Sequence, residues 1–196
     1  MPIGVAILGA GNIVHDGESI EMGFFNVKRR VLPYRAFPSS ANMRPLSLEA
    51  VYSRSQESAE QLVQAFTKLV STYFDTPALA GRSLNDLLAR KDIDAVIIAL
   101  PIPVQPEVIE RATRAGKHML SEKPIARDVE TAVQLVRCYD DIKAKPIWLV
   151  GANFRFLDSI ALGAYQIQIL GGKVMTFSVA AYGFVDEYDK FYRTAW

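Results

Sequence analysis

Near its amino terminus the chain reads Ile3-Gly4-Val5-Ala6-Ile7-Leu8-Gly9-Ala10-Gly11-Asn12-Ile13-Val14, an apolar run that ends in a pair of glycines. Its first part has the length and composition of a buried strand. In a dinucleotide-binding fold, Gly9 would permit the tight turn and Gly11 would let the backbone approach a pyrophosphate. Val14 stands at the third glycine position of that fingerprint. The alternative is an ordinary glycine turn after a buried strand.

Along the rest of the chain, apolar runs of strand length alternate with segments of helical period. Strands are expected at residues 46–52, 72–74, 94–100, 117–120 and 147–150, and helices at residues 55–69, 83–89, 106–115 and 128–143. The run at 95–100 is apolar throughout, as a strand covered on both faces should be. This alternation predicts an α/β fold with a Rossmann-type, doubly wound parallel sheet and right-handed crossovers.

The pattern changes after the sixth expected strand. We place a dinucleotide-binding Rossmann domain at residues 1–150 and part of a C-terminal substrate and dimerisation domain at 151–196. In the second part, a helix is expected at 157–170 and a long strand at 173–182. Because that strand needs partners that the remaining residues do not supply, the chain is expected to stop inside an α+β domain with a mostly antiparallel sheet.

Residues 18–44 interrupt the rhythm of the first domain. The residue that reads the ribose normally follows the glycines by about 20 positions, whereas Ser53 lies roughly 40 positions beyond Gly11. The segment carries two prolines and a basic run at 28–30, and its helical period is poor. We expect an insertion here. A surface loop, retained non-coding sequence, and a lid or contact arm all fit this segment.

The overall composition narrows the classes of function. A net charge of +1 gives no reason to expect nucleic acid or an anionic membrane as a partner. No apolar run approaches the ~20 residues of a membrane span, and no signal peptide is evident. With Cys138 as the single cysteine and two histidines, no metal site is expected. A cytoplasmic protein with a small-molecule substrate fits these observations.

The end of the second strand, Val51-Tyr52-Ser53-Arg54-Ser55, bears on the choice of dinucleotide. An NAD site usually offers an acidic residue here for the ribose 2′-hydroxyl, whereas an arginine suits a 2′-phosphate. Ser53 and Arg54 are therefore expected at the 2′-phosphate, and NADP is favoured over NAD. The alternative is a solvated arginine at a helix start.

Two further segments end strands at the edge of the sheet where ligands of open α/β folds bind. Leu100-Pro101-Ile102-Pro103 takes the chain across the carboxyl end of the central strand. Asn153-Phe154-Arg155-Phe156 follows the sixth strand, and its two polar residues share one face if the backbone is extended. A simple strand terminator and a linker with aromatic anchors are the alternatives.

Glu122-Lys123-Pro124 ends the fifth strand on the same edge. The ammonium of Lys123 can donate a proton to a substrate oxygen as hydride arrives at carbon. Glu122 can orient the lysine or contact the ribose, and Pro124 can carry a cis peptide bond. The alternative for this tripeptide is a surface salt bridge.

Taken in this order, the motifs resemble the glucose-fructose oxidoreductase, inositol dehydrogenase and rhizopine-catabolism family, and look most like its fungal members of unknown substrate. The match covers most of residues 1–182 outside the expected insertion. The matching pieces are Ile7-Leu8-Gly9-Ala10-Gly11-Asn12-Ile13, Val51-Tyr52-Ser53-Arg54-Ser55, Ala95-Val96-Ile97-Ile98-Ala99-Leu100-Pro101, Ala115-Gly116-Lys117-His118-Met119-Leu120-Ser121-Glu122-Lys123-Pro124 and Asn153-Phe154-Arg155-Phe156. The piece that ends in Glu122-Lys123-Pro124 is the specific one.

The resemblance implies a Rossmann domain followed by a domain whose open sheet often forms a homo-oligomer interface. It implies that Lys123 is the family's catalytic lysine. Gln105 stands where many members have a histidine, and the family's downstream aspartate and histidine would lie beyond Trp196. The cofactor-binding residues expected from motif and resemblance together are Gly9, Gly11, Asn12, Ile13, Ser53, Arg54, Leu100, Pro101, Gln105, Glu122, Lys123, Asn153 and Arg155.

The function expected from this resemblance is NAD(P)-dependent oxidation or reduction, by hydride transfer, of a sugar, polyol, dihydrodiol or related carbonyl or alcohol substrate. This chain is expected to be catalytically incomplete. A non-catalytic, dinucleotide-sensing regulator that binds a protein partner is the alternative, since some family relatives are of that kind. A truncated or mis-spliced product without function is a third reading.

Overall fold

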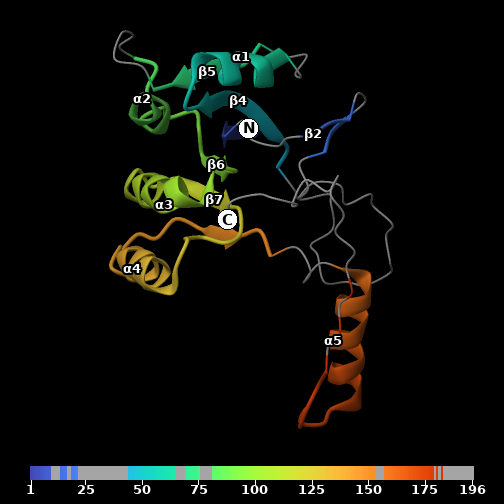
Figure 1. Cartoon of the computed structure of the whole chain (residues 1–196). Helices are drawn as coiled ribbons and strands as arrows, with labels where there is room; N and C mark the ends of the chain where they lie inside the picture. The colour runs from blue at the N-terminus through green and yellow to red at the C-terminus, as the bar shows by residue number, and fades with distance from the viewer. Residues whose placement is uncertain are drawn as a thin grey trace. The chain divides into compact units, whose positions relative to one another are not determined.

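The computed structural model describes residues 1–9, 14–16, 19–21, 44–64, 69–75, 81–152, 157–178, 180 and 182. The chain divides into two compact units, Met1–Gly151 and Ala152–Trp196. Figure 1 shows the elements of both units. Among the described residues, no helix is long and apolar enough to cross a membrane.

The first unit is built on a six-stranded parallel sheet. Its strands are β1 (Ile3–Leu8), β4 (Leu46–Ser53), β5 (Ser71–Phe74), β6 (Ala95–Ile98), β7 (His118–Ser121) and β8 (Trp148–Val150). The order across the sheet is β5-β4-β1-β6-β7-β8, and every pairing is parallel. This is the strand order of a Rossmann fold, in which the order reverses between β1 and β6. The predicted fold is therefore confirmed.

Helices connect these strands as crossovers. They are α1 (Gln56–Gln64), α2 (Leu84–Leu88), the short 3-10 helix η2 (Ile102–Val104), α3 (Gln105–Arg114) and α4 (Val129–Asp140). Ser83 and Asp86 form a capping box at the start of α2, and the Asp128 side chain accepts from the Thr131 N–H at the start of α4. Such caps satisfy N–H groups that have no partner within the helix.

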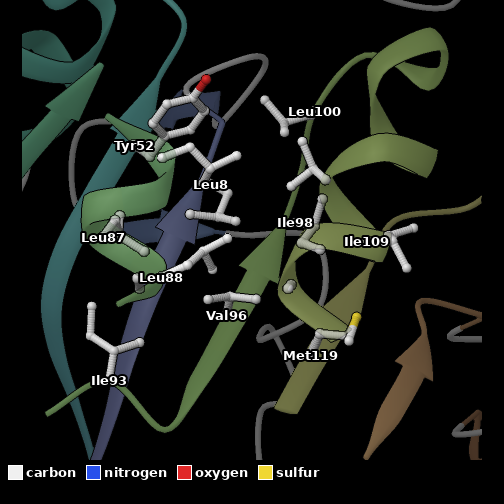
Figure 2. Close-up of a cluster of buried hydrophobic side chains, with 14 of the residues drawn as sticks. Leu8, Tyr52, Leu87, Leu88, Ile93, Val96, Ile98, Leu100, Ile109 and Met119 are labelled. Atoms are coloured by element: carbon white, nitrogen blue, oxygen red, sulfur yellow. The ribbon is translucent and has the colours of Figure 1, made fainter. Parts of the chain in front are cut away.

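Two apolar clusters cover the two faces of the sheet. On one face, side chains of β1 and β6 pack against α2, α3 and Leu135 of α4, and Figure 2 shows Leu8, Ile98 and Ile109 within this cluster. On the other face, Ile7 and its neighbours pack against Leu62 of α1. Successive residues of β1 therefore point to opposite, covered faces, which explains its continuous apolar sequence. With both faces covered, the carboxyl edge of the sheet is where a site can lie.

A second, two-stranded antiparallel sheet joins β2 (Val14–Asp16) and β3 (Ser19–Glu21). The sequence did not predict these strands, because three residues are too few to show a period. β3 falls at the start of the expected insertion, residues 18–44. The rest of that segment, up to residue 43, lies outside the described residues.

The second unit contains the helix α5 (Asp158–Leu170), which ends at Gly171 with a φ of 65°. The helix was predicted within one residue of these bounds. The strand predicted at 173–182 is wrong for its described residues, since 173–178, 180 and 182 adopt no strand. An isolated strand leaves its backbone groups unpaired, and no described residue of this unit supplies a partner strand. None of the described side chains of this unit is buried.

Candidate functional site

The turn after β1 approaches the end of β6 at the point where the strand order reverses. Gly9 has a φ of 116°, and its N–H donates to the Tyr52 carbonyl at 2.8 Å. A Cβ on Gly9 would collide with the carbonyl oxygen of Ala99. Glycine is therefore required here both by the backbone conformation and by the close approach of the two chains. The next predicted residues, Gly11, Asn12 and Ile13, lie outside the described residues.

The carboxyl ends of the central strands are tied together by backbone hydrogen bonds beyond the sheet itself. The Ala99 N–H donates to Leu8 at 2.8 Å, and the Glu122 N–H donates to Ile98 at 2.9 Å. Leu100 is buried, whereas Pro101 is exposed at the start of η2. The structure thus brings the predicted residues Gly9, Leu100, Pro101, Glu122 and Lys123 to one edge of the sheet.

Lys123 is exposed at this edge, two residues after the end of β7. Its backbone N–H donates to the Glu122 carboxylate at 3.0 Å, and the Lys123–Pro124 peptide bond is cis. Within the described part of the chain, no acceptor contacts the Lys123 ammonium, and Glu122 forms no ion pair with it. The surface salt bridge considered from sequence is therefore not formed within this tripeptide.

Gln105 begins α3 and is almost completely buried, with 1% of its surface exposed. Its Nε2 donates to the carbonyl oxygen of Pro124 at 3.2 Å. Its Oε1 is buried, and no described residue donates a hydrogen bond to it. The partner seen for this predicted cofactor residue is thus the backbone next to Lys123.

The end of β4 carries the residues expected at the ribose. Ser53 is buried and Arg54 is exposed. Sequence reasoning missed Asp75, which follows β5 and accepts a hydrogen bond from the Tyr52 hydroxyl at 2.5 Å. Burial, reinforced by this hydrogen bond, raises the pKa of Tyr52 above its ordinary value. Only the position of Asp75, directly after an expected strand, could have pointed to this pair in advance.

The other predicted residues of the site, Asn153 and Arg155, lie outside the described residues. Across the residues that the structure describes, no group of three His, Cys, Asp or Glu side chains could hold a metal ion. This edge therefore offers glycine backbone, the Lys123 ammonium, which has no partner among the described residues, and the exposed guanidinium of Arg54. These groups suit an anionic, phosphate-bearing ligand and proton donation to an oxygen.

A cavity of about 580 Å³ lies at the opposite, amino edge of the sheet, by the carboxyl ends of α2 and α3. Its lining is basic, but most of these cations already have partners. Arg90 pairs with Asp92 at 2.6 Å, Arg111 pairs with Glu107 at 3.2 Å, and Arg114 pairs with Glu110 at 2.7 Å. The Lys117 ammonium donates to two backbone carbonyls, both at 2.7 Å. We interpret this cavity as part of the scaffold.

Comparison with known proteins agrees with this geometry. Residues 3–147 match the model of an oxidoreductase family with an NAD-binding Rossmann fold. Dehydrogenase FPY6 of Fusarium mangiferae is 40% identical over 99% of this chain and 50% of its own length. A dTDP-3,4-didehydro-2,6-dideoxy-alpha-D-glucose 3-reductase of Streptomyces violaceoruber is 41% identical over 74% of this chain and 37% of its own length.

Solved structures show the same fold. A 3-ketoreductase from Actinomadura kijaniata, solved with NADP and TDP-benzene, is 26% identical with a TM-score of 0.56, and the match covers 86% of this chain and 43% of that one. The chain spans half or less of the two curated relatives described above. Because the family model covers most of the chain, the resemblance seen in its motifs is confirmed. The chain belongs to this oxidoreductase family, with its NAD-binding Rossmann fold.

Proposed function

We propose that the chain binds NADP(H) at the carboxyl edge of its sheet and serves hydride transfer to or from a sugar, polyol, dihydrodiol or related carbonyl or alcohol. One observation supports this most strongly. Gly9 packs against Ala99 where the strand order reverses, and Lys123, whose ammonium has no partner among the described residues, lies on the same edge. In open α/β sheets this is where dinucleotides bind.

The proposed cofactor contacts follow the strand ends. The pyrophosphate would lie on the turn from Gly9 to Ile13, and the 2′-phosphate on Ser53 and Arg54. The remaining proposed contacts are Leu100, Pro101, Glu122, Lys123, Asn153 and Arg155. An exposed arginine after β4 supports NADP over NAD, because a guanidinium binds a phosphate through charge-assisted hydrogen bonds.

The bound nicotinamide would supply the hydride, or accept it in the reverse direction. In the reductive direction, the ammonium of Lys123 donates its proton to the carbonyl oxygen while the carbonyl carbon gains hydride, which gives the alcohol. Exposure of Lys123 without a described partner supports this role, because a lysine held in an ion pair would first have to release it.

The division of work between the two parts of the chain is also a proposal. Residues 1–150 would form the dinucleotide-binding domain, and residues 151–196 would contribute part of a substrate and dimerisation domain. The exposed apolar side chains of α5, such as Ile160, Leu162 and Leu170, support a role in contacts with further protein. A cytoplasmic location fits the single, free cysteine, Cys138.

The cofactor proposal is tested by titrating the chain with NADPH and with NADH. We expect tighter binding of NADPH. Arg54→Ala should weaken NADPH binding by about 10- to 100-fold, because a charge-assisted hydrogen bond is lost, and should leave the affinity for NADH unchanged. Arg137→Ala, at an exposed arginine of α4, is the matched control and should change neither constant. An equal loss of affinity for NADPH and NADH in Arg54→Ala would contradict a 2′-phosphate contact.

A further inference from the structure

We propose that Gln105 is a positioning residue that sets where the Lys123 ammonium lies. It does so through the backbone of Pro124, without touching the cofactor or the substrate itself. The inference rests on the proposed role of Lys123 and gives Gln105 a different role from the cofactor contact that the motifs suggest.

The hydrogen bond joins two neighbouring connections of the sheet. Gln105 begins the helix that follows β6, whereas Pro124 lies in the segment that follows β7. The Gln105 Nε2 donates to the Pro124 carbonyl at 3.2 Å, and 1% of the Gln105 surface is exposed. Because water has little access to this amide, the bond does not compete with solvent and fixes the two segments relative to each other.

The same segment is also held on the amino side of Lys123. The Glu122 N–H donates to Ile98 of β6 at 2.9 Å, and the Lys123 N–H donates to the Glu122 carboxylate at 3.0 Å. The backbone is thus fixed before and after Lys123, while no described residue binds its ammonium. A proton donor needs its backbone to be held in place, because a displacement of about 1 Å can cost on the order of a hundredfold in rate.

The chemistry of the contact explains why a donor is needed at this position. A carbonyl oxygen accepts hydrogen bonds, so a carboxylate at position 105 would face another acceptor and a methionine would offer no donor. A histidine could still donate a ring N–H. The Oε1 of Gln105 is buried, and none of the described residues donates to it. The donor half of the amide therefore carries the contact that the structure shows.

The test follows the Lys123 side chain directly and does not need turnover. The lysines of the chain are converted to 13C-dimethyl-lysines and observed by NMR, and the Lys123 signal is the one missing from Lys123→Arg. In Gln105→Met we expect the chemical shift of the Lys123 signal to change in the free chain. Gln105→His should return it toward the original position. Gln134→Met, at an exposed glutamine of α4, is the matched control and should leave the signal unchanged.

Titration with NADPH separates this inference from the proposed function. If Gln105 acts by positioning, Gln105→Met keeps the NADPH dissociation constant within about twofold and alters the response of the Lys123 signal at saturation. An unchanged Lys123 signal, free and bound, in folded Gln105→Met would overturn the inference. So would a loss of NADPH affinity with a normal Lys123 signal, which would indicate a direct cofactor contact.

Two further outcomes are also decisive. If the original chain fails to bind NADPH, the proposed function fails, whereas the Lys123 signal of the free variants still tests the positioning role. If Gln105→Met does not fold, Gln105→Asn keeps the amide but shortens its reach, and the same change in the Lys123 signal is expected. A Gln105→Asn chain with an unaltered signal would then overturn the inference.

Discussion

Lys117 and Lys123 stand just before and just after β7, at opposite edges of the same sheet, and their surroundings differ completely. Lys117 has 9% of its surface exposed, and its ammonium donates to the carbonyls of Arg90 and Ile93, both at 2.7 Å. Lys123 is exposed, and none of the described residues accepts a hydrogen bond from its ammonium. The first lysine is bound within the fold, whereas the second has no hydrogen-bond partner among the described residues and fits the role proposed for it.

The neighbours of the two lysines repeat this contrast. At the amino edge, the Asp94 carboxylate accepts from the Gly4 N–H at 2.9 Å, and Arg90 pairs with Asp92. At the carboxyl edge, Arg54 is exposed and Gly9 brings backbone, without a side chain, against Ala99. The charged groups at the amino edge are paired with one another, whereas those at the carboxyl edge are exposed. This contrast favours the carboxyl edge as the ligand site.

Lys123→Met tests the exposed lysine and should have the largest effect. In a form of the protein that turns over a substrate, we expect kcat/KM to fall by about 10²- to 10⁴-fold, because the proton donor is lost. The free energy of unfolding should change by less than about 0.5 kcal/mol, since the side chain is exposed. Steady-state kinetics and urea unfolding measure the two quantities. Turnover close to that of the original protein would remove Lys123 from the mechanism.

Gly9→Ala tests the close approach at the carboxyl edge. We expect the free energy of unfolding to fall by about 3 kcal/mol or more, because alanine is strained at a φ of 116° and its Cβ meets the Ala99 carbonyl. Urea unfolding measures the loss. Gly163→Ala is the control, since that glycine lies in α5 with open space around it and a favourable change is expected. A Gly9→Ala chain of unaltered stability would contradict this account of the turn.

Lys117→Met tests the buried lysine and should reverse the pattern of Lys123→Met. Removing the ammonium leaves the carbonyls of Arg90 and Ile93 without this donor, so we expect a loss of about 2 kcal/mol in unfolding free energy. The NADPH dissociation constant should stay the same, because Lys117 lies at the opposite edge. Lys91→Met, at an exposed neighbour, serves as the control and should be close to neutral. A selective loss of NADPH binding in Lys117→Met would contradict the assignment of Lys117 to the scaffold.

A smaller effect is expected from the titration of Lys117. Burial lowers the pKa of this ammonium below its usual 10.5, although Asp94 and Asp92 oppose the shift. Between the lowered native pKa and 10.5, the unfolded chain binds more protons than the native chain, so the unfolding free energy should rise with pH. The rise is obtained as the difference between the original chain and Lys117→Met. The raised pKa of Tyr52 has the opposite effect above about pH 10.0, but it is common to both chains and cancels in this difference. A difference that stays flat or falls would contradict the buried environment.

The parallel sheet could be predicted because its central strands, β1 and β6, are covered on both faces and read as apolar runs, most clearly at 95–100. The strand order itself appears only in the structure, since pairing depends on contacts distant in sequence. The strand expected at 173–182 shows the limit of this reasoning, because an apolar period does not supply a partner.

The residues of the candidate site could also be predicted only in part. Gly9 and Lys123 follow strands whose carboxyl ends must meet at one edge, so their placement could be derived. The hydrogen bond from Gln105 to Pro124 and the pairing of Tyr52 with Asp75 could not, because neither has a sequence pattern. Both depend on side chains from different strand ends, which come together only once the sheet has formed.

The account is tested most directly by the dissociation constant of NADPH for this chain, measured by the fluorescence of the nicotinamide. We predict saturable binding at one site per chain, competition by NADP, and an unchanged constant in Lys117→Met. A folded chain that shows no saturable binding of NADPH would contradict the central claim, namely that the carboxyl edge is a dinucleotide site.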